Sequence, residues 1–254
     1  MSRLRREVRV FFTAVMFLTR LPVPRWTDHR PEYLRQAPRY FPWVGLIVGL
    51  IAAGVYEAAR LVFPVNIALV ASMVSSILAT GAFHEDGFAD VCDGFGGGWT
   101  KEKILAIMKD SRLGTFGVIG LGAMLGLKFL TLQALTGAPL VALLLFAHAA
   151  SRLFPVAIMQ TYPYAGDTEA SKSRDVTGRL QPVGILLALG VLVVPALMLP
   201  PAYLLTLVPA ALVTFGLARY FARWIGGYTG DCLGAIQQVT ELTIYLGAYI
   251  IASQ

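Results

Sequence analysis

The sequence predicts an all-α fold: a polytopic membrane helical bundle with about seven transmembrane helices and an N-terminal interfacial or re-entrant helix. Hydrophobic residues make up 56% of the 254 residues, and the mean hydropathy is +0.65. Charged residues make up 14%, whereas a typical soluble domain has about 25%. Because apolar runs follow one another along most of the chain, we expect one integral membrane catalytic domain over residues 1–254.

The apolar runs are long enough, at about 20 residues each, to cross a bilayer as helices. They are residues 41–63, 65–83, 114–135, 139–162, 182–199, 201–222 and 233–252. Residues 8–21 form a shorter apolar stretch that contains Arg20 and is followed by prolines at positions 22 and 24, which end a helix. We therefore expect residues 8–21 to form the interfacial or re-entrant helix.

The distribution of Lys and Arg predicts the orientation of these helices. If the N-terminus is cytoplasmic and residues 8–21 do not cross, the loops 84–113, 163–181 and 223–232 are also cytoplasmic. The basic residues of these segments are Arg3, Arg5, Arg6, Arg9, Arg25, Arg30, Arg35, Arg39, Lys101, Lys103, Lys109, Arg112, Lys172, Arg174, Arg179 and Arg223. The opposite connections, at 64, 136–138 and 200, hold no Lys or Arg.

This asymmetry predicts a multi-pass protein of the cytoplasmic (inner) membrane, with its N-terminus and its active site on the cytoplasmic side. No cleavable signal peptide is recognisable. The net charge of +6 is explained by orientation and by attraction to membrane lipid or a phosphorylated substrate, so no nucleic-acid partner is expected. The sequence predicts no oligomeric state.

The segment GAFHEDGFADVCDGFGGG, residues 81–98, carries the strongest chemical signal. If it is helical, Asp86, Asp90 and Asp93 are spaced i, i+4 and i+7 and share one stripe of the helix. Carboxylates this close repel one another unless a cation lies among them, and their hard oxygen atoms suit Mg²⁺. We expect Glu85 and these three aspartates to be the metal ligands, with a solvated acidic helix end as the alternative.

The residues after this segment predict a surface helix and a phosphate contact. Residues 99–113 have an amphipathic pattern, with Thr100 as a possible N-cap. The side chains expected to face lipid are Ile104, Leu105, Ile107 and Met108, and those expected to face water are Lys101, Lys103 and Lys109. Lys109, Asp110, Ser111 and Arg112 follow. Arg112 is either a bidentate phosphate ligand or an interfacial arginine whose guanidinium lies in water at the membrane surface.

Several polar residues interrupt the apolar runs, where they are costly without a partner. Ser151 and Arg152 lie in the run 139–162, one turn after His148, and we expect Arg152 to face a polar cavity and contact phosphate. A structural ion pair is the alternative. Glu57 and Lys128 lie at nearly matched depths and are predicted to pair, with Arg60 sharing the contact.

The last apolar run begins beside Asp231 in the motif TGDCLGA. An acid at a helix N-terminus is either a cap or, with glycines before it, a ligand. Gln237, Gln238 and Glu241 are expected to point into the bundle. Cys92 and Cys232 are expected to be reduced residues without a disulfide or metal.

The chain has no Ser/His/Asp series, P-loop or dinucleotide-binding fingerprint. Acidic residues and arginines on one membrane face instead indicate metal-assisted phosphoryl transfer, in which the protein positions phosphates and neutralises charge.

Six motifs resemble one family. They are FLTRLPVP (17–24), FPWVGLIVG (41–49), HEDGFADVCDGFGGG (84–98), IMKDSRLGTFG (107–117), SR (151–152) and TGDCLGA (229–235). Together they resemble the adenosylcobinamide-GDP ribazoletransferase (cobalamin synthase) family. The resemblance implies an Mg²⁺-dependent membrane enzyme that joins adenosylcobinamide-GDP to α-ribazole or its 5′-phosphate. The products would be adenosylcobalamin or its 5′-phosphate and GMP, in the last steps of cobalamin biosynthesis.

With this reaction in view, the predicted catalytic residues are Asp90, Asp93, Arg112 and Arg152, and one of the two aspartates is the proton acceptor. The predicted substrate-binding residues are His84, Lys109, Asp110, Ser111, Arg112, Ser151, Arg152 and Asp231. The predicted metal ligands are Glu85, Asp86, Asp90 and Asp93.

Two other functions fit part of the pattern. A membrane phosphotransferase of the CDP-alcohol type also has aspartates at helical spacing, but here Asp90 stands where its motif has arginine. An ion-coupled transporter would hold its acids near the bilayer midplane, within inverted repeats that are not visible here.

Overall fold

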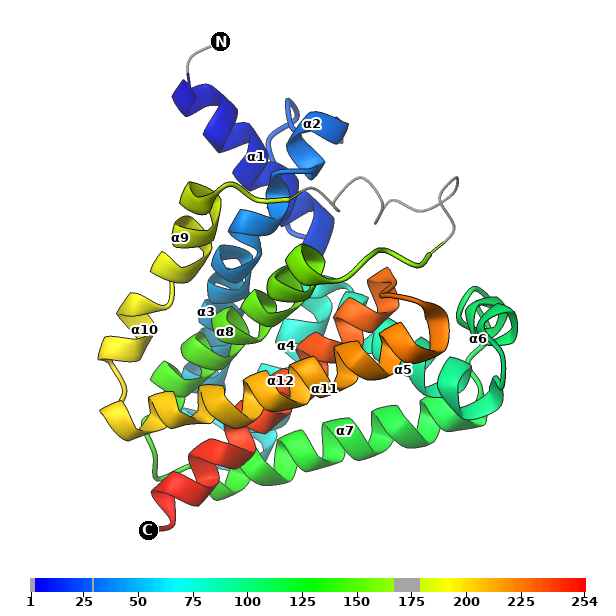
Figure 1. The fold of residues 1–254 in the computed structure, drawn as a ribbon. Helices are drawn as coiled ribbons and strands as arrows, with labels where there is room; N and C mark the ends of the chain where they lie inside the picture. Colours follow the sequence, from blue (N-terminus) through cyan, green and yellow to red (C-terminus); the bar gives the residue numbers. More distant parts are fainter. Residues whose placement is uncertain (1–2, 29, 167–178) are drawn as a thin grey trace.

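The computed structural model describes residues 3–28, 30–166 and 179–254, and this part of the chain is built from helices (Figure 1). The elements are α1 (Arg3–Leu18), α2 (Pro31–Leu34), η1 (Ala37–Tyr40), α3 (Phe41–Ala59), α4 (Val65–Thr80), α5 (Phe83–Gly97), α6 (Lys101–Met108), α7 (Thr115–Ala134), α8 (Leu140–Thr161), α9 (Pro182–Gly190), α10 (Val193–Leu197), η3 (Pro201–Thr206), α11 (Leu207–Ile225) and α12 (Gly230–Ala252). The predicted all-α membrane fold is confirmed. The loop 163–181, with Lys172 and Arg174, lies mostly outside the described residues.

Four helical segments of the described chain are long and apolar enough to cross a membrane: residues 37–59, 115–134, 140–161 and 201–225. The bent pair of α4 and α5 raises the number to five if it counts as one span. The predicted run 182–199 is divided into α9 and the five-residue α10, which contains Pro195. The run 233–252 lies within the 23-residue α12, whose polar residues lower its hydropathy. Length and composition therefore support four or five of the seven predicted spans.

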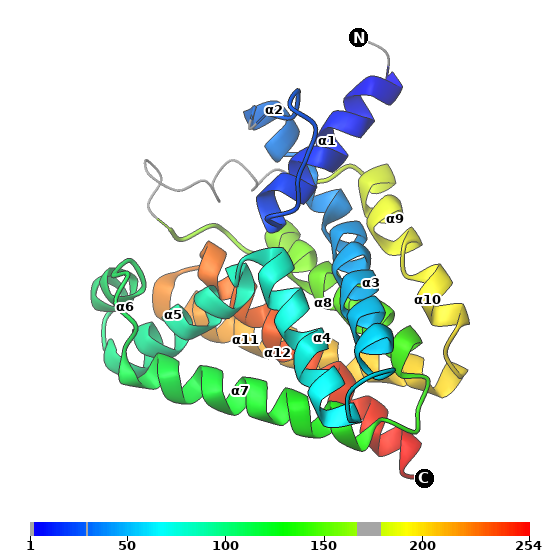
Figure 2. The same cartoon turned by 180° about the vertical axis from the view of Figure 1, so that it is seen from behind.

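The centre of the bundle is formed by α8, which packs against α3 and α12 (Figure 2). Sixteen of the 22 residues of α8 are buried. Glycines on α3 permit the close approach, since a Cβ at Gly49 would lie 3.1 Å from the Leu144 carbonyl oxygen of α8. Small residues at such contacts let helix backbones pack closely in a membrane protein.

A sharp bend between α4 and α5 places the acidic segment across the bundle. The two helix axes differ by 88°, and Gly81 and Ala82 both have positive φ, of 66° and 60°. The Ala82 N–H donates to the Ile77 carbonyl at 2.9 Å, which closes the end of α4. The left-handed conformation is unfavourable for alanine. The bend directs α5 away from α4 and onto α12, its main contact.

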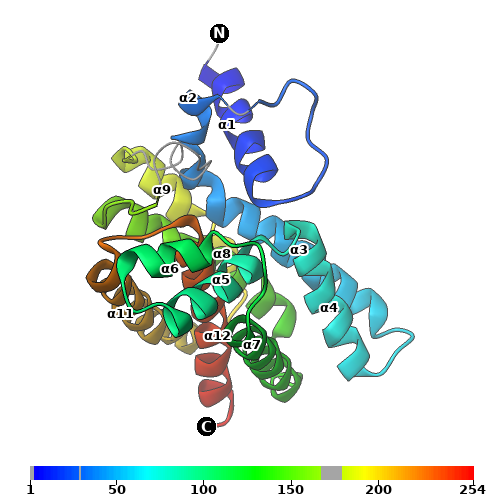
Figure 3. The ribbon, with the colours of Figure 1, turned by 90° about the vertical axis from the view of Figure 1, so that its right-hand side faces the viewer.

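The short helix α6 lies against α5 and α11, as Figure 3 shows. Its N-cap is confirmed, because Thr100 Oγ1 accepts a hydrogen bond from the Lys103 N–H at 3.3 Å. The prediction that Ile104 and Met108 face lipid was wrong, since both are buried. Gly94 on α5 explains the difference: without a side chain there, α5 leaves room for Met108 and for the backbone of Ile104.

Candidate functional site

The predicted acid stripe lies on α5 and meets the first turn of α12. The two helices cross where both have glycine: a Cβ at Gly87 would lie 2.9 Å from the Cα of Asp231, and one at Gly234 would lie 3.2 Å from the His84 carbonyl oxygen. This crossing brings Asp231, from a distant part of the sequence, beside the stripe. The carboxylates of Asp231, Asp86 and Asp93 all lie near enough to repel a charge on Asp90.

The aspartates of this cluster differ in their surroundings. Asp86 is exposed, Asp90 is half-buried, and neither has a hydrogen-bond or ion-pair partner among the described residues. Asp231 accepts a long hydrogen bond of 3.4 Å from Thr229, which is the actual N-cap of α12. The cluster thus concentrates negative charge without an ion-pair partner among the described residues. No group of three His, Cys, Asp or Glu side chains in the described chain is already arranged to hold a metal ion.

Asp93, the third residue of the stripe, closes the N-terminus of α7. Its Oδ2 accepts from the Gly114 N–H at 2.7 Å, and its Oδ1 accepts from the Gly117 N–H at 2.8 Å. These amides belong to the first turn, where a helix has no internal acceptors and favours negative charge. A Cβ on either glycine would collide with the carboxylate. The structure therefore gives Asp93 a clear structural role, and its predicted metal and catalytic roles stay predictions.

The structural role predicts a stability effect for Asp93→Ala. The substitution should lower the free energy of unfolding by about 0.5–2 kcal/mol, because two amides at the start of α7 lose their acceptor. Thermal unfolding in detergent measures this, with Glu102→Ala at an exposed position of α6 as a control. If the Asp93→Ala variant is as stable as the unsubstituted chain but has lost activity, Asp93 takes part in the reaction instead.

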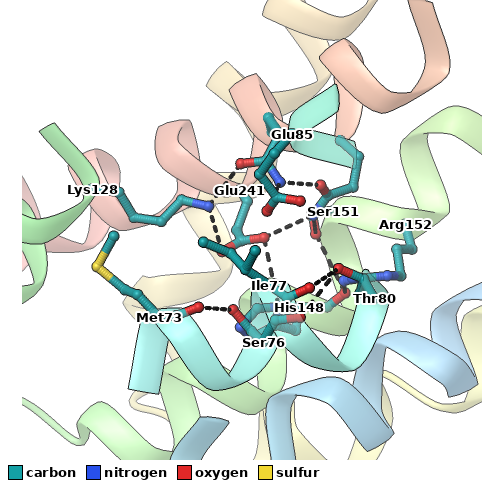
Figure 4. A network of polar contacts seen from close by, with 12 residues as sticks. Met73, Ser76, Ile77, Thr80, Glu85, Lys128, His148, Ser151, Arg152 and Glu241 are labelled. Atoms are coloured by element: carbon teal, nitrogen blue, oxygen red, sulfur yellow. Dashed lines mark hydrogen bonds and ion pairs between the residues drawn. The ribbon is translucent and has the colours of Figure 1, made fainter. Parts of the chain in front are cut away.

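Glu85, the fourth predicted metal ligand, faces the interior and joins a buried polar network (Figure 4). Its Oε1 accepts from Gln238 Nε2 at 2.9 Å, and its Oε2 is buried without a hydrogen-bond partner. Gln238 also accepts from Lys128 Nζ at 2.9 Å, which links α5, α7 and α12. Glu85 thus lies apart from the side of α5 that carries the aspartates, and its predicted metal ligation stays a prediction.

Glu241 is the central acid of this network. It forms an ion pair of 3.1 Å with Lys128, lies 3.6 Å from His148 Nδ1 and accepts from Gln237 at 2.7 Å. The predicted Lys128–Glu57 pair was wrong, although the pairing of Glu57 with Arg60 is confirmed at 2.6 Å near the surface. Equal depth in the bilayer does not determine which way two side chains point around their helices. The face of α7 that carries Lys128 packs on α12.

Arg152 is 3% exposed and has few partners. Its Nη1 donates to the His148 carbonyl at 2.9 Å, its Nε has no acceptor, and no described carboxylate is within ion-pair distance. It borders a cavity of about 40 Å³ with His84 and the rings of Phe17, Phe41 and Phe83. The predicted cavity is therefore mostly apolar, with room for a few waters. Ser151 instead joins the polar network, since its Oγ accepts from Gln237 at 3.0 Å.

The segment 109–112 lies at the surface beyond α6. Arg112 donates from Nε and Nη2 to the Asp110 carboxylate at 2.5–3.1 Å, and these hydrogen bonds lower the pKa of Asp110 to about 2. The Arg112 side chain is 87% exposed. Lys109 and Ser111 are exposed as well. Arg112 thus binds Asp110 in this structure, and its contact with a substrate phosphate stays a prediction.

The polar residues of α12 were recognised only in part from the sequence. Gln237, Gln238 and Glu241 point into the bundle as expected, but their links to Glu85, Lys128 and Ser151 were not foreseen. The sequence signal for these links was the presence of polar residues at helical spacing within an apolar run. Cys92 and Cys232 are free thiols in the described chain.

Comparisons with known proteins place the chain in a family. The family model described as cobalamin-5-phosphate synthase matches residues 10–249. A protein of Leptothrix cholodnii named adenosylcobinamide-GDP ribazoletransferase is 44% identical, with 97% of each chain covered. Proteins of the same name from Shewanella frigidimarina and Leptospira interrogans are 43% and 42% identical, covering 95% and 97% of this chain and 94% and 97% of their own. No solved structure matches. Because the family match includes the acid stripe, the bend before it and the start of α12, the chain belongs to the cobalamin-5-phosphate synthase family of enzymes.

Proposed function

We propose that the chain joins adenosylcobinamide-GDP to α-ribazole, or to α-ribazole 5′-phosphate, and releases GMP. The product is adenosylcobalamin or its 5′-phosphate. The observation that carries this proposal is the likeness to ribazoletransferases over 97% of the chain. The unpaired carboxylates at the crossing of α5 and α12 supply a site suited to the reaction.

The carboxylates fit a bound Mg²⁺ in their chemistry. Mg²⁺ commonly takes one or two protein carboxylates together with substrate phosphates and waters, so a cage of three protein ligands is not required. Asp86 and Asp90 have no other partners among the described residues, and Asp231 lies beside them. We assign these side chains to the ion. When bound, the ion neutralises charge that develops on the diphosphate.

The reaction is a displacement at the phosphorus that bears the cobinamide. A ribose hydroxyl of α-ribazole forms the new P–O bond, and the bond between the two phosphates breaks to release GMP. A carboxylate has two oxygens, so one oxygen of Asp90 can contact the ion while the other accepts the hydroxyl proton. We assign the proton to Asp90 because, of the two aspartates without a partner among the described residues, it is the half-buried one. The buried guanidinium of Arg152, which has a free Nε, is the group we assign to a substrate phosphate.

Purified chain in detergent or nanodiscs tests the function directly. Incubation with cobinamide-GDP, α-ribazole and Mg²⁺ should release GMP and form the joined corrinoid in equal amounts. Omission of α-ribazole separates transfer from hydrolysis. GMP release that does not depend on α-ribazole would contradict the proposal.

Arg152→Lys should keep the fold but weaken substrate binding. Lysine retains the charge and loses the planar, bidentate donor geometry. We expect the KM for cobinamide-GDP to rise about tenfold, with thermal stability close to that of the unsubstituted chain. If stability falls and KM does not change, Arg152 has only a structural role.

We also propose that the reaction occurs at the cytoplasmic face of the inner membrane. A cysteine introduced near the N-terminus or in the segment 84–113 should then react with a membrane-impermeant thiol reagent only from the cytoplasmic side. A cysteine at the C-terminus should react only from outside. Single cysteines at the exposed positions Lys101 and Ser253 measure this, in a chain whose own cysteines have been replaced. Labelling of position 101 from outside would reverse the orientation.

A further inference from the structure

We infer that a groove between α1, η1 and α9 binds the phosphate headgroup of an anionic phospholipid. The groove has a volume of about 770 Å³ and lies on the same side of the molecule as the N-terminus, where Figures 1 and 2 show α1 above α9. Its basic lining residues are Arg6, Arg35, Arg39 and Arg179. This inference is independent of the proposed reaction.

The groove has an excess of positive charge. Among the described residues the groove has one lining carboxylate, Glu7, which accepts from the Tyr40 hydroxyl at 2.8 Å and forms an ion pair of 2.9 Å with Arg39. Arg6, Arg35 and Arg179 have no ion pair or hydrogen bond from their side chains within the described chain. The Nε of Arg39 is buried without an acceptor. Arginines gathered around one space repel one another unless an anion lies among them, and phosphate matches the guanidinium geometry.

The groove also has apolar lining residues, and α9 and α10 carry further exposed apolar side chains. Leu180, Val183 and Leu187 line the groove. Beyond them the exposed side chains are Leu186 at 68%, Val194 at 65% and Leu197 at 81%. A ligand with a phosphate and long acyl chains satisfies both surfaces, whereas a free phosphate leaves the apolar residues unused. Basic pockets between membrane helices bind anionic headgroups in this manner.

The apolar lining residues are held by hydrogen bonds to the core helices. Trp43 of α3 donates from Nε1 to the Leu187 carbonyl at 2.9 Å, and Gln160 of α8 accepts from the Leu180 N–H at 2.7 Å. These bonds attach the apolar residues of the groove to α3 and α8, and a lipid bound there would link α9 to α1.

Binding of phosphatidylglycerol to detergent-purified protein tests the inference. The variant Arg6→Gln/Arg35→Gln/Arg179→Gln should bind phosphatidylglycerol at least about tenfold more weakly than the unsubstituted chain. A matched control, Arg25→Gln/Arg219→Gln/Arg223→Gln, makes the same charge change at exposed arginines outside the groove and should bind normally. Arg35→Gln alone, on the surface, gives a milder loss if the triple variant does not fold.

Two further ligands identify the source of the phosphate. Phosphatidylcholine, which is zwitterionic, should bind weakly to every variant, and soluble glycerol 3-phosphate should not compete with phosphatidylglycerol at equal concentration. Equal losses in the groove and control variants would overturn the inference, because they would indicate attraction to overall charge. Competition by glycerol 3-phosphate would overturn it in favour of a soluble phosphate ligand.

Discussion

Purified chain with Asp90→Asn should release GMP about 10²–10³-fold more slowly than the unsubstituted chain when both substrates and Mg²⁺ are present. Asparagine has nearly the same size, but it removes both the negative charge and the proton acceptor from the cluster. Asp86→Asn should cause a similar loss, since Asp86 is the other carboxylate of α5 that has no partner among the described residues. Initial rates of GMP release at saturating substrate measure both effects.

The same variants should fold as well as the unsubstituted chain or better. Asp90 is repelled by Asp231, Asp86 and Asp93, so loss of its charge relieves repulsion in the absence of metal. Glu57→Gln is a matched control, because it neutralises an acid that lies near the surface and pairs with Arg60. Normal turnover in both Asp86→Asn and Asp90→Asn would show that the stripe does not carry the chemistry.

Glu241→Gln should lower the free energy of unfolding by about 3–5 kcal/mol, because it leaves the ammonium of Lys128 buried without its counter-charge. Lys128 is 5% exposed and Glu241 is 2% exposed, so water cannot replace the lost partner. Thermal unfolding in detergent measures the change.

A double substitution separates the charge pair from simple packing. Replacement of both residues, as Lys128→Met/Glu241→Leu, removes both buried charges and should recover much of the stability lost in Glu241→Gln. The gain of the double variant over the single variant is then the signature of an uncompensated charge. A Glu241→Gln protein as stable as the unsubstituted chain would mean that Lys128 finds another partner or loses its proton.

The helical organisation and the acid stripe could be predicted from the sequence because both depend on local periodicity. Three carboxylates at helical spacing lie on one helix, α5, as expected. The contribution of Asp231 could not be assigned, because it depends on the crossing of α5 and α12 at two glycines far apart in the chain. The bend at Ala82 was also unforeseen, since alanine rarely adopts positive φ.

The incorrect or incomplete predictions concern which face of a helix meets which neighbour. Depth along the bilayer suggested a partner for Lys128, but helix rotation directs it to Glu241. The amphipathic pattern of α6 predicted that its apolar side faces lipid. That side packs against α5 instead, because Gly94 has no side chain and leaves room for it. Asp93 shows that equal spacing on one stripe does not mean an equal role, because the first turn of α7 meets only that carboxylate.

We propose that Asp86 and Asp90 would hold the divalent ion together with the substrate diphosphate. Titration of Mn²⁺ into purified protein, followed by electron paramagnetic resonance with and without cobinamide-GDP, tests this assignment. We predict that cobinamide-GDP tightens Mn²⁺ binding in the unsubstituted chain and in Glu57→Gln, and that Asp86→Asn and Asp90→Asn each weaken it about tenfold or more. The same Kd for Mn²⁺ in all four proteins in the presence of cobinamide-GDP would contradict the claim.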